Sequence, residues 1–162
     1  MKQTIFLILL AILIGVEVKA QTDSIVRAKI LDDGAKEAEK IYNKGIADFS
    51  AKKYTSALEN FNEAIKLKAT FERAFYNRGT TKIELNDFAG ALLDFNTAIS
   101  LAATAESFFG RAMVYMHDKN TGSALEDFSK AIELKQDYAQ AYYYRGALKF
   151  ETKDYKAAEA DY

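Results

Sequence analysis

The sequence of 162 residues contains no cysteine, no proline, no tryptophan and a single histidine. Because there is no cysteine, disulfide bonds cannot stabilise the fold, although export to an oxidising compartment is permitted. Basic and acidic side chains nearly balance, with a formal net charge of −1. Since nucleic-acid binding depends on clustered lysine and arginine, this balance gives no electrostatic case for a nucleic-acid partner.

Signatures of catalysis and metal binding are also missing. The sequence has no G-x-S-x-G, no H-E-x-x-H, no glycine-rich phosphate loop and no calcium-loop spacing. His117, next to Asp118, is expected in a solvated turn, and Asp32 and Asp33 beside Gly34 are interpreted as a helix-end signal. We therefore predict a protein that is not an enzyme and that needs no cofactor and no metal.

The N-terminus has the organisation of a secretory signal peptide. Lys2 supplies a positive charge, residues 5–16 are apolar, and Ala20 precedes Gln21 as the expected cleavage point. An apolar run of 12 residues is shorter than the roughly 20 that span a bilayer. We predict that residues 1–20 are removed, that the mature chain has no stable membrane insertion, and that it is periplasmic or secreted. The alternative is an uncleaved N-terminal segment that anchors the chain.

The main feature of the remaining sequence is an internal repeat. An Ala-x-x-x-Phe-x-x-Ala phrase begins at Ala57, Ala91 and Ala124 and starts again at Ala158, at intervals of 34, 33 and 34 residues. A period of this length indicates a helical hairpin copied along the chain, each copy needing a neighbour to bury its apolar face. Apolar residues recur with a helical period, so no strands are expected. The predicted copies are residues 38–71, 72–104, 105–138 and the incomplete 139–162.

Residues 21–37 precede the first copy. The apolar side chains Ile25, Ile30 and Leu31 indicate a short helix that packs on the first hairpin and ends near Gly34. The alternative is that this segment is a linker.

The small and aromatic residues of the copies resemble a known family. Small residues at the eighth and twentieth positions, an aromatic residue at the twenty-fourth and alanine at the twenty-seventh are similar to the tetratricopeptide repeat. This resemblance covers residues 38–162 and implies an all-α fold, a right-handed α-solenoid of about three and a half stacked antiparallel hairpins. Gly79 and Ala91 illustrate the small residues that let two helices approach closely. The family's proline near the end of the second helix is replaced by Ala69 and Ala103, which favours second helices that run on into the next turn.

Arginine at the seventh position of a copy is accompanied by aspartate at the twenty-third. The pairs are Arg78 with Asp94, Arg111 with Asp127 and Arg145 with Asp161, whereas Lys44 is accompanied by Asn60. Because an arginine fork matches a carboxylate with two hydrogen bonds, we predict an ion pair between the helices of each of those three hairpins. The alternative is that these arginines bind an acidic ligand.

The resemblance also implies that the first helices line a concave groove that binds a partner. Aromatic, sulfur-containing and amide side chains, types common at interfaces, occupy many of its positions. The predicted groove residues are Tyr42, Asn43, Ile46, Phe49, Tyr76, Asn77, Thr80, Ile83, Phe109, Met113, Met116, Tyr143, Tyr144 and Phe150. The competing interpretation is that the rings pack between neighbouring helices, and half-buried rings can do both. Of the positions with which family members bind an acidic C-terminal tail, only Asn77 fits, so that ligand is not expected.

We predict an exported, non-catalytic protein–protein interaction module that binds a peptide or protein segment in this groove. The second helix of the last copy is half present at Tyr162. This motivates an alternative, in which the sequence is the N-terminal sensory or scaffold region of a longer envelope protein with a separate effector domain.

Overall fold

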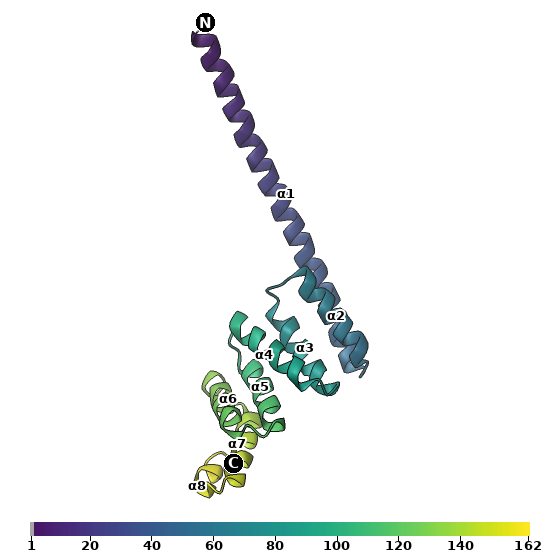
Figure 1. The fold of residues 1–162 in the computed structure, drawn as a ribbon, viewed down its shortest axis with the longest axis vertical. Helices are drawn as coiled ribbons and strands as arrows, with labels where there is room; N and C mark the ends of the chain where they lie inside the picture. The colour runs from purple at the N-terminus through teal and green to yellow at the C-terminus, as the bar shows by residue number, and fades with distance from the viewer. Residues whose placement is uncertain (1) are drawn as a thin grey trace. The chain divides into compact units, whose positions relative to one another are not determined.

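The computed structural model describes the backbone of residues 2–162 and the side chains of residues 17 and 19–162. Within these residues all regular secondary structure is helical, which confirms the predicted all-α fold of stacked hairpins (Figure 1). The helices of the described residues are α1 (Lys2–Ser50), α2 (Tyr54–Leu67), α3 (Glu72–Glu84), α4 (Phe88–Leu101), α5 (Ala105–His117), α6 (Thr121–Leu134), α7 (Ala139–Glu151) and α8 (Tyr155–Glu159). The chain divides into two compact units, Met1–Glu37 and Ala38–Tyr162.

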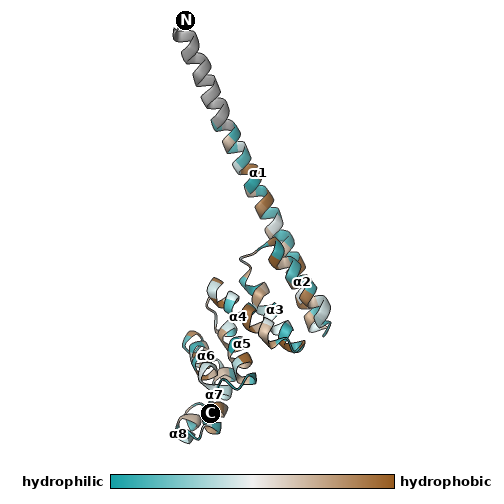
Figure 2. Cartoon of the chain, in the orientation of Figure 1, coloured by the Kyte–Doolittle hydropathy of each residue, from teal (hydrophilic) through white to brown (hydrophobic). Residues whose placement is uncertain are grey.

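The N-terminal helix does not end where the sequence suggested. α1 continues through Gly34 without a break, so the expected helix end near this residue is wrong. A glycine inside a helix costs only about 1 kcal/mol relative to alanine. An ion pair one turn apart, between Asp32 and Lys36, also spans the expected break. Ile25 and Leu31, which were expected to pack, are exposed, and Figure 2 shows apolar and polar residues intermixed along this part of α1.

The predicted signal peptide lies outside the residues whose side chains are described, apart from Glu17, Lys19 and Ala20. Its removal therefore stays a prediction. Among the described residues, no helix combines the length and the apolar character needed to cross a membrane.

The second unit consists of four helical hairpins that follow one another along the chain. The end of α1 pairs with α2, α3 with α4, α5 with α6, and α7 with α8. Each second helix contacts the first helix of the next hairpin, so the hairpins stack in chain order (Figure 1). Phe61, Phe95 and Phe128 on the second helices are fully buried, as expected for side chains that fill the space between hairpins.

Glycine gives room where the Phe61 and Phe95 rings meet the first helices. A Cβ atom added to Gly45 would lie 2.7 Å from the Phe61 ring, and one added to Gly79 would lie 3.2 Å from Phe95. Phe95 also contacts Gly110 of the following hairpin, where an added Cβ would lie 2.5 Å away. This last contact was not predicted from the sequence. The same ring therefore restricts side-chain size in its own hairpin and in the next one.

Each hairpin turns through one residue with a positive φ angle. These residues are Lys52 (58°), Asn86 (61°), Lys119 (58°) and Lys153 (66°). In the second hairpin, the Asn86 N–H donates to the Ile83 carbonyl at 2.9 Å and the Asp87 N–H donates to the Lys82 carbonyl at 2.8 Å. This pair of bonds is a Schellman motif, and it satisfies carbonyl groups that the helix end would leave unpaired.

The residue after each of these turns is the N-cap of the second helix. Asp87, Asn120 and Asp154 accept a hydrogen bond from a backbone N–H three residues ahead. Lys53 holds the same place in the first hairpin and provides no side-chain cap. The first hairpin therefore lacks a stabilising contact that the other three have.

The second helices end although proline is absent. The last helical residues are Leu67, Leu101 and Leu134, and the backbone leaves the helical conformation at the residue that follows each, with extended geometry at Ala102 and Lys135. The expected continuation into the next turn is therefore wrong. A turn follows α2 and α6, in which the Phe71 N–H donates to the Lys68 carbonyl at 3.0 Å and the Tyr138 N–H donates to the Lys135 carbonyl at 3.1 Å. These turns let Phe71 pack 4.9 Å from the Tyr42 ring and Tyr138 pack 5.1 Å from Phe109, measured between ring centroids. A continuous helix would carry these rings away from the core.

The predicted ion pairs are present in three hairpins. Each arginine donates from Nε and Nη2 to both carboxylate oxygens of its partner, at 2.5 to 2.9 Å. The pairs are Arg78–Asp94, Arg111–Asp127 and Arg145–Asp161. The remaining nitrogen, Nη1, donates to the preceding hairpin, where the acceptors are Asn62, Asn96 and Ser129. Because all three guanidinium groups are engaged within the chain, the structure favours ion pairing over binding of an acidic ligand.

Candidate functional site

The predicted groove residues all lie on the first helices of the hairpins, namely α1 from Ala38 onward, α3, α5 and α7. We call the surface of these helices the first-helix face. At the fifth position of each copy, Tyr42 is buried, Tyr76 and Phe109 are half-buried, and Tyr143 is 59% exposed. The same position in four copies therefore has very different access to solvent.

Packing inside the hairpins distinguishes Tyr143 from the other three rings. The ring centroids are 5.8 Å apart for Tyr42 and Phe61, and the corresponding contacts involve Tyr76 with Phe95 and Phe109 with Phe128. Tyr143 instead meets Tyr144 and Tyr162 edge to face. The packing interpretation thus accounts for part of the surface of the first three rings, and Tyr143 retains the most surface for a partner.

The residues at the ninth and twelfth positions also differ in their exposure to solvent. Five of these residues are half-buried against the cores of their hairpins, namely Ile46, Phe49, Ile83, Met113 and Met116. Thr80 is also half-buried, and its hydroxyl donates to the Tyr76 carbonyl at 3.1 Å. Phe150 is exposed and meets Tyr155 edge to face.

At the sixth position, the side chains differ in their exposure and in the contacts that they make within the chain. Asn43 is exposed. Asn77 donates from Nδ2 to the Tyr42 hydroxyl at 2.9 Å and to the Arg73 carbonyl at 2.8 Å, which leaves its Oδ1 to accept from a partner. Tyr144 is half-buried and stacks on Phe128.

A cavity of about 380 Å³ opens on the first-helix face where α1, α3 and the start of α5 meet. It is lined by Tyr42, Glu72, Arg73, Tyr76, Asn77, Thr104 and Glu106. The structure therefore brings three predicted groove residues together, Tyr42, Tyr76 and Asn77, from two neighbouring hairpins.

The cavity exists because one aromatic residue is missing from the repeat pattern. Phe71 and Tyr138, the residues just before α3 and α7, cover the fifth-position rings of the hairpins that precede them. Thr104 holds the equivalent place before α5 and brings no ring to cover Tyr76. The copy that ends at Thr104 is also one residue shorter than its neighbours. The space that an aromatic side chain fills in the other two copies remains open here.

Four lining residues were not among the predicted site residues. Arg73 and Glu106 occupy the second position of their copies, a groove-facing position in the resembled family, and this signal would have identified them. Glu72 and Thr104 are at the beginning of helices and gave no signal. Their place in the cavity depends on how two hairpins pack.

Burial affects the titratable groups of the cavity. It raises the pKa of the Glu72 carboxyl above its ordinary value, although a hydrogen bond from Ser107 and the charge of Arg73 act in the opposite direction. Burial also raises the pKa of the Tyr76 hydroxyl. The raised pKa means that the charged form of Glu72 is disfavoured in the cavity. Ser107 and Arg73 therefore compensate its negative charge only in part.

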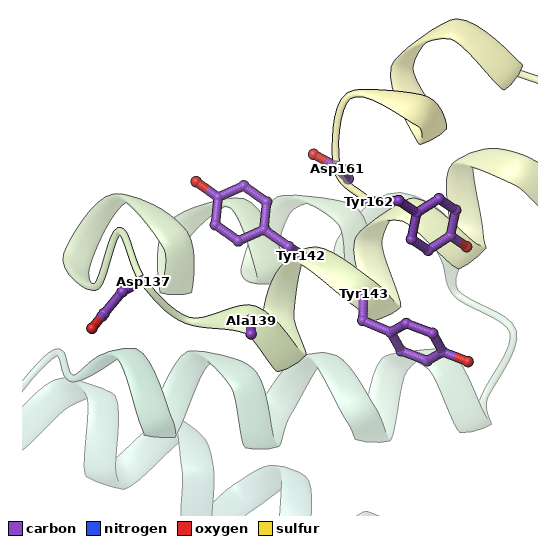
Figure 3. Close-up of a pocket in the computed structure, with 6 residues that line it drawn as sticks. All are labelled: Asp137, Ala139, Tyr142, Tyr143, Asp161 and Tyr162. Carbon is purple, nitrogen blue, oxygen red and sulfur yellow. The ribbon is translucent and has the colours of Figure 1, made fainter.

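A second cavity of about 370 Å³ lies at the last hairpin and is lined by Asp137, Ala139, Tyr142, Tyr143, Asp161 and Tyr162 (Figure 3). Figure 3 shows the rings of Tyr142 and Tyr143 on different sides of α7, with Tyr162 near Tyr143. Burial acts to raise the pKa of Asp161, but hydrogen bonds from Arg145 and Lys149 outweigh it and hold the pKa below its ordinary value. The Asp161 carboxylate is therefore compensated within the chain.

The described residues include no group of three histidine, aspartate or glutamate side chains that is arranged to hold a metal ion. His117, at the end of α5, is exposed and lies with Nδ1 3.0 Å from an Asp118 carboxylate oxygen, as expected for a residue beside a solvated turn. Its ring also stacks on Phe88 of the preceding hairpin, with centroids 3.5 Å apart, a contact that was not predicted from the sequence.

The recurring hairpins were compared with known proteins. The family described as tetratricopeptide repeat matches residues 72–104 and 105–138. The match covers the second and third of the four copies. The comparison with curated protein sequences finds no match.

Several solved structures have the same fold. MamA from Desulfovibrio magneticus RS-1 is 22% identical, with a TM-score of 0.70 over 76% of this chain and 71% of that one. The first tetratricopeptide domain of Spaghetti (RPAP3), bound to the HSP90 peptide SRMEEVD, is 19% identical, with a TM-score of 0.71 over 74% and 95%. YrrB, described as having an unusual peptide-binding site, is 18% identical, with a TM-score of 0.70 over 83% and 70%. At these identities the similarity shows the fold alone.

Proposed function

We propose that this chain is a non-catalytic protein-interaction module that binds a peptide or protein segment along the first-helix face. The observation that carries the proposal is the cavity between α1, α3 and α5, where aromatic and polar side chains of neighbouring hairpins share an opening. Two structures with this fold support it, since one holds an HSP90 peptide and another is described as having a peptide-binding site.

The lining residues suit an extended segment. The rings of Tyr42 and Tyr76 provide contact area, and tyrosine is common at interfaces because it is both apolar and able to form hydrogen bonds. Asn77 Oδ1 is placed to accept a backbone N–H from the segment. Farther along the same face, the exposed rings of Tyr143 and Phe150 offer additional contacts.

The test is to fill the cavity. Octapeptides are selected from a random display library on the full chain, and the affinity of the best peptide is then measured on Thr104→Tyr. This change blocks the opening with the type of ring that Tyr138 supplies in the third copy. It also removes the hydrogen bond with which Thr104 caps α5, and Tyr138 at the start of α7 shows that the fold accommodates an N-cap without such a bond. We expect binding about tenfold weaker.

The matched control is Thr55→Tyr, which adds the same ring to an exposed position on α2. We expect this variant to bind the peptide as the unchanged chain does. Failure to select any peptide, or an equal loss of affinity in both variants, would contradict the proposal. Circular dichroism on both variants checks that the helices remain folded.

We also propose that the chain is exported and that residues 1–20 are removed. The support is the sequence pattern of Lys2, the apolar run at residues 5–16 and the small residue Ala20. The test is expression of the full chain in a bacterium, followed by fractionation and N-terminal sequencing. A periplasmic or secreted product that begins at Gln21 is expected. An intact N-terminus in the membrane fraction would instead support the anchored form.

A further inference from the structure

The cavity between α1, α3 and α5 contains two carboxylates that the chain compensates only in part. Glu72 accepts a hydrogen bond from the Ser107 hydroxyl at 3.3 Å. The Glu106 carboxylate has the Lys135 ammonium 3.7 Å away, and both of these side chains are about half exposed. An exposed ion pair at such a distance contributes little, so much of the negative charge at Glu106 is left for another partner.

The positive group of the cavity is already engaged. Arg73 donates from Nη2 to both carboxylate oxygens of Glu39, at 2.8 and 3.1 Å. Lys68 also lies 4.0 Å from Glu39. Because Arg73 pairs with Glu39, its charge compensates the neighbouring Glu72 carboxylate only in part.

The pKa values of the neighbouring groups agree with a negative potential. After burial, which is the larger cause, the charge of Glu106 is among the influences that raise the pKa values of Glu72 and Tyr76. It acts in the same direction on Tyr138, whose pKa burial raises to about 12. A positive group in the cavity would relieve this repulsion.

The aromatic wall is suited to a cation as well. The Arg73 guanidinium carbon lies 5.2 Å from the centre of the Tyr42 ring, so this ring already accepts a cation on its face. The neighbouring Tyr76 ring is half-buried but has no aromatic cover, because Thr104 takes the place of an aromatic residue. The opening thus offers one more tyrosine ring beside two carboxylates.

We infer that this cavity recognises a lysine or arginine side chain of the bound segment, with Glu72 and Glu106 as the ion-pair partners and Tyr76 as the wall. The inference rests on the proposed function and specifies the chemistry of the segment. A carboxylate in the same place would face two like charges, and a neutral side chain would leave them uncompensated.

The experiment compares octapeptides selected from a random display library on the full chain and on the variant Glu72→Gln/Glu106→Gln. Glutamine keeps the shape of glutamate and removes the charge, so the variant is expected to stay folded, and thermal unfolding measures the cost of losing two carboxylates from the first turns of α3 and α5. We expect lysine and arginine to be enriched in the peptides from the unchanged chain and not in those from the variant. The selected peptide should bind the variant about tenfold more weakly.

The matched control is Glu63→Gln/Glu133→Gln, which removes two exposed carboxylates from the second helices α2 and α6. It should bind the selected peptide with unchanged affinity. In the peptide itself, replacing its lysine or arginine by glutamine should weaken binding about tenfold, and glutamate should weaken it further.

The outcomes separate the two proposals. Peptides that are blocked by Thr104→Tyr but show no preference for lysine or arginine would overturn this inference and leave the proposed function intact. Enrichment of acidic peptides, or equal affinity for the double variant and the unchanged chain, would also overturn it. If no peptide is selected, both proposals fail.

Discussion

The first and second hairpins share their packing but differ in the polar contact between their helices. In the second hairpin Asp94 on α4 is held by Arg78 and by the Lys82 ammonium, 2.9 Å away. In the first hairpin Asn60 takes the place of Asp94 and donates from Nδ2 to Asp48 on α1, at 2.8 Å. The carboxylate of this contact is therefore on the second helix of the second hairpin and on the first helix of the first hairpin.

The two hairpins share the packing of their helices and differ in the type of polar contact between them. In both, a fully buried phenylalanine lies against a glycine of the first helix, Phe61 against Gly45 and Phe95 against Gly79. A polar contact between the helices is present in both as well, but in one it joins charged groups and in the other an amide and a carboxylate. We conclude that tight packing defines the hairpin and that an ion pair is one of two ways to satisfy its polar groups.

The largest expected effect comes from removing the buried phenylalanine ring that the hairpins share. Phe61→Ala and Phe128→Ala should each lower the free energy of unfolding by about 3–5 kcal/mol, because both rings are fully buried and no neighbour can refill the space. Urea unfolding monitored by circular dichroism measures the effect. A loss below about 1 kcal/mol in the first hairpin would show that its packing is not equivalent.

The next effect concerns the polar contact. Asp94→Asn leaves Arg78 and Lys82 without their carboxylate, and we expect a loss of about 2–3 kcal/mol, less than for a fully buried pair because both cations are 18% exposed. In the first hairpin, Asn60→Asp places a second carboxylate beside Asp48 and should cost about 1 kcal/mol at neutral pH.

A compensating change sharpens this comparison. Asp48→Lys combined with Asn60→Asp recreates the charges of the second hairpin and should recover the stability lost by Asn60→Asp alone. The free energies of unfolding of the single and double variants form the test. If Asn60→Asp alone stabilised the chain, the proposed difference between the hairpins would be wrong.

The ion pair also predicts a dependence on pH. The pKa of Asp161 is below its ordinary value of 3.8, so the unfolded chain binds this proton more readily than the folded one. The stabilisation by Asp161 is therefore complete above that value and is lost as the pH falls through the lower folded pKa. Below about pH 4, the free energy of unfolding should fall more steeply for the unchanged chain than for Asp161→Asn. Parallel curves would contradict this assignment.

A smaller effect concerns the helix caps. Lys53→Asp introduces into the first hairpin the cap that Asp87 provides in the second, and we expect a gain of about 1 kcal/mol. Asp87→Ala should cost a similar amount. Thermal unfolding of both variants measures the difference, and a loss of stability on Lys53→Asp would show that another contact holds this turn.

The smallest effect concerns the residues with positive φ. Lysine is strained at a positive φ angle, and asparagine tolerates this conformation better. Lys119→Gly should therefore raise the free energy of unfolding by about 0.5 kcal/mol, and Asn86→Gly should raise it by less. Urea unfolding of the two variants makes the comparison. A larger gain at Asn86 would contradict it.

Much of the fold was predictable because its signals are local to one copy. The spacing of Ala91, Phe95 and Gly79 identifies the hairpin, and the joint occurrence of Arg78 and Asp94 identifies its ion pair. Predictions about helix ends failed in both directions. α1 continues through Gly34, because one glycine is a weak break, and α4 ends without proline, because the following residues adopt an extended backbone.

The sequence by itself determined the hairpin, since helical period, small residues and paired charges recur within about 34 residues of chain. Only the tertiary structure decided which groove positions remain open. Tyr42 is buried and Tyr143 is exposed although both hold the fifth position, because Tyr42 packs on Phe61 and is covered by Phe71, whereas Tyr143 meets other rings edge to face. The cavity beside Tyr76 has the same origin, since it requires three consecutive hairpins and a threonine where the other copies have an aromatic side chain.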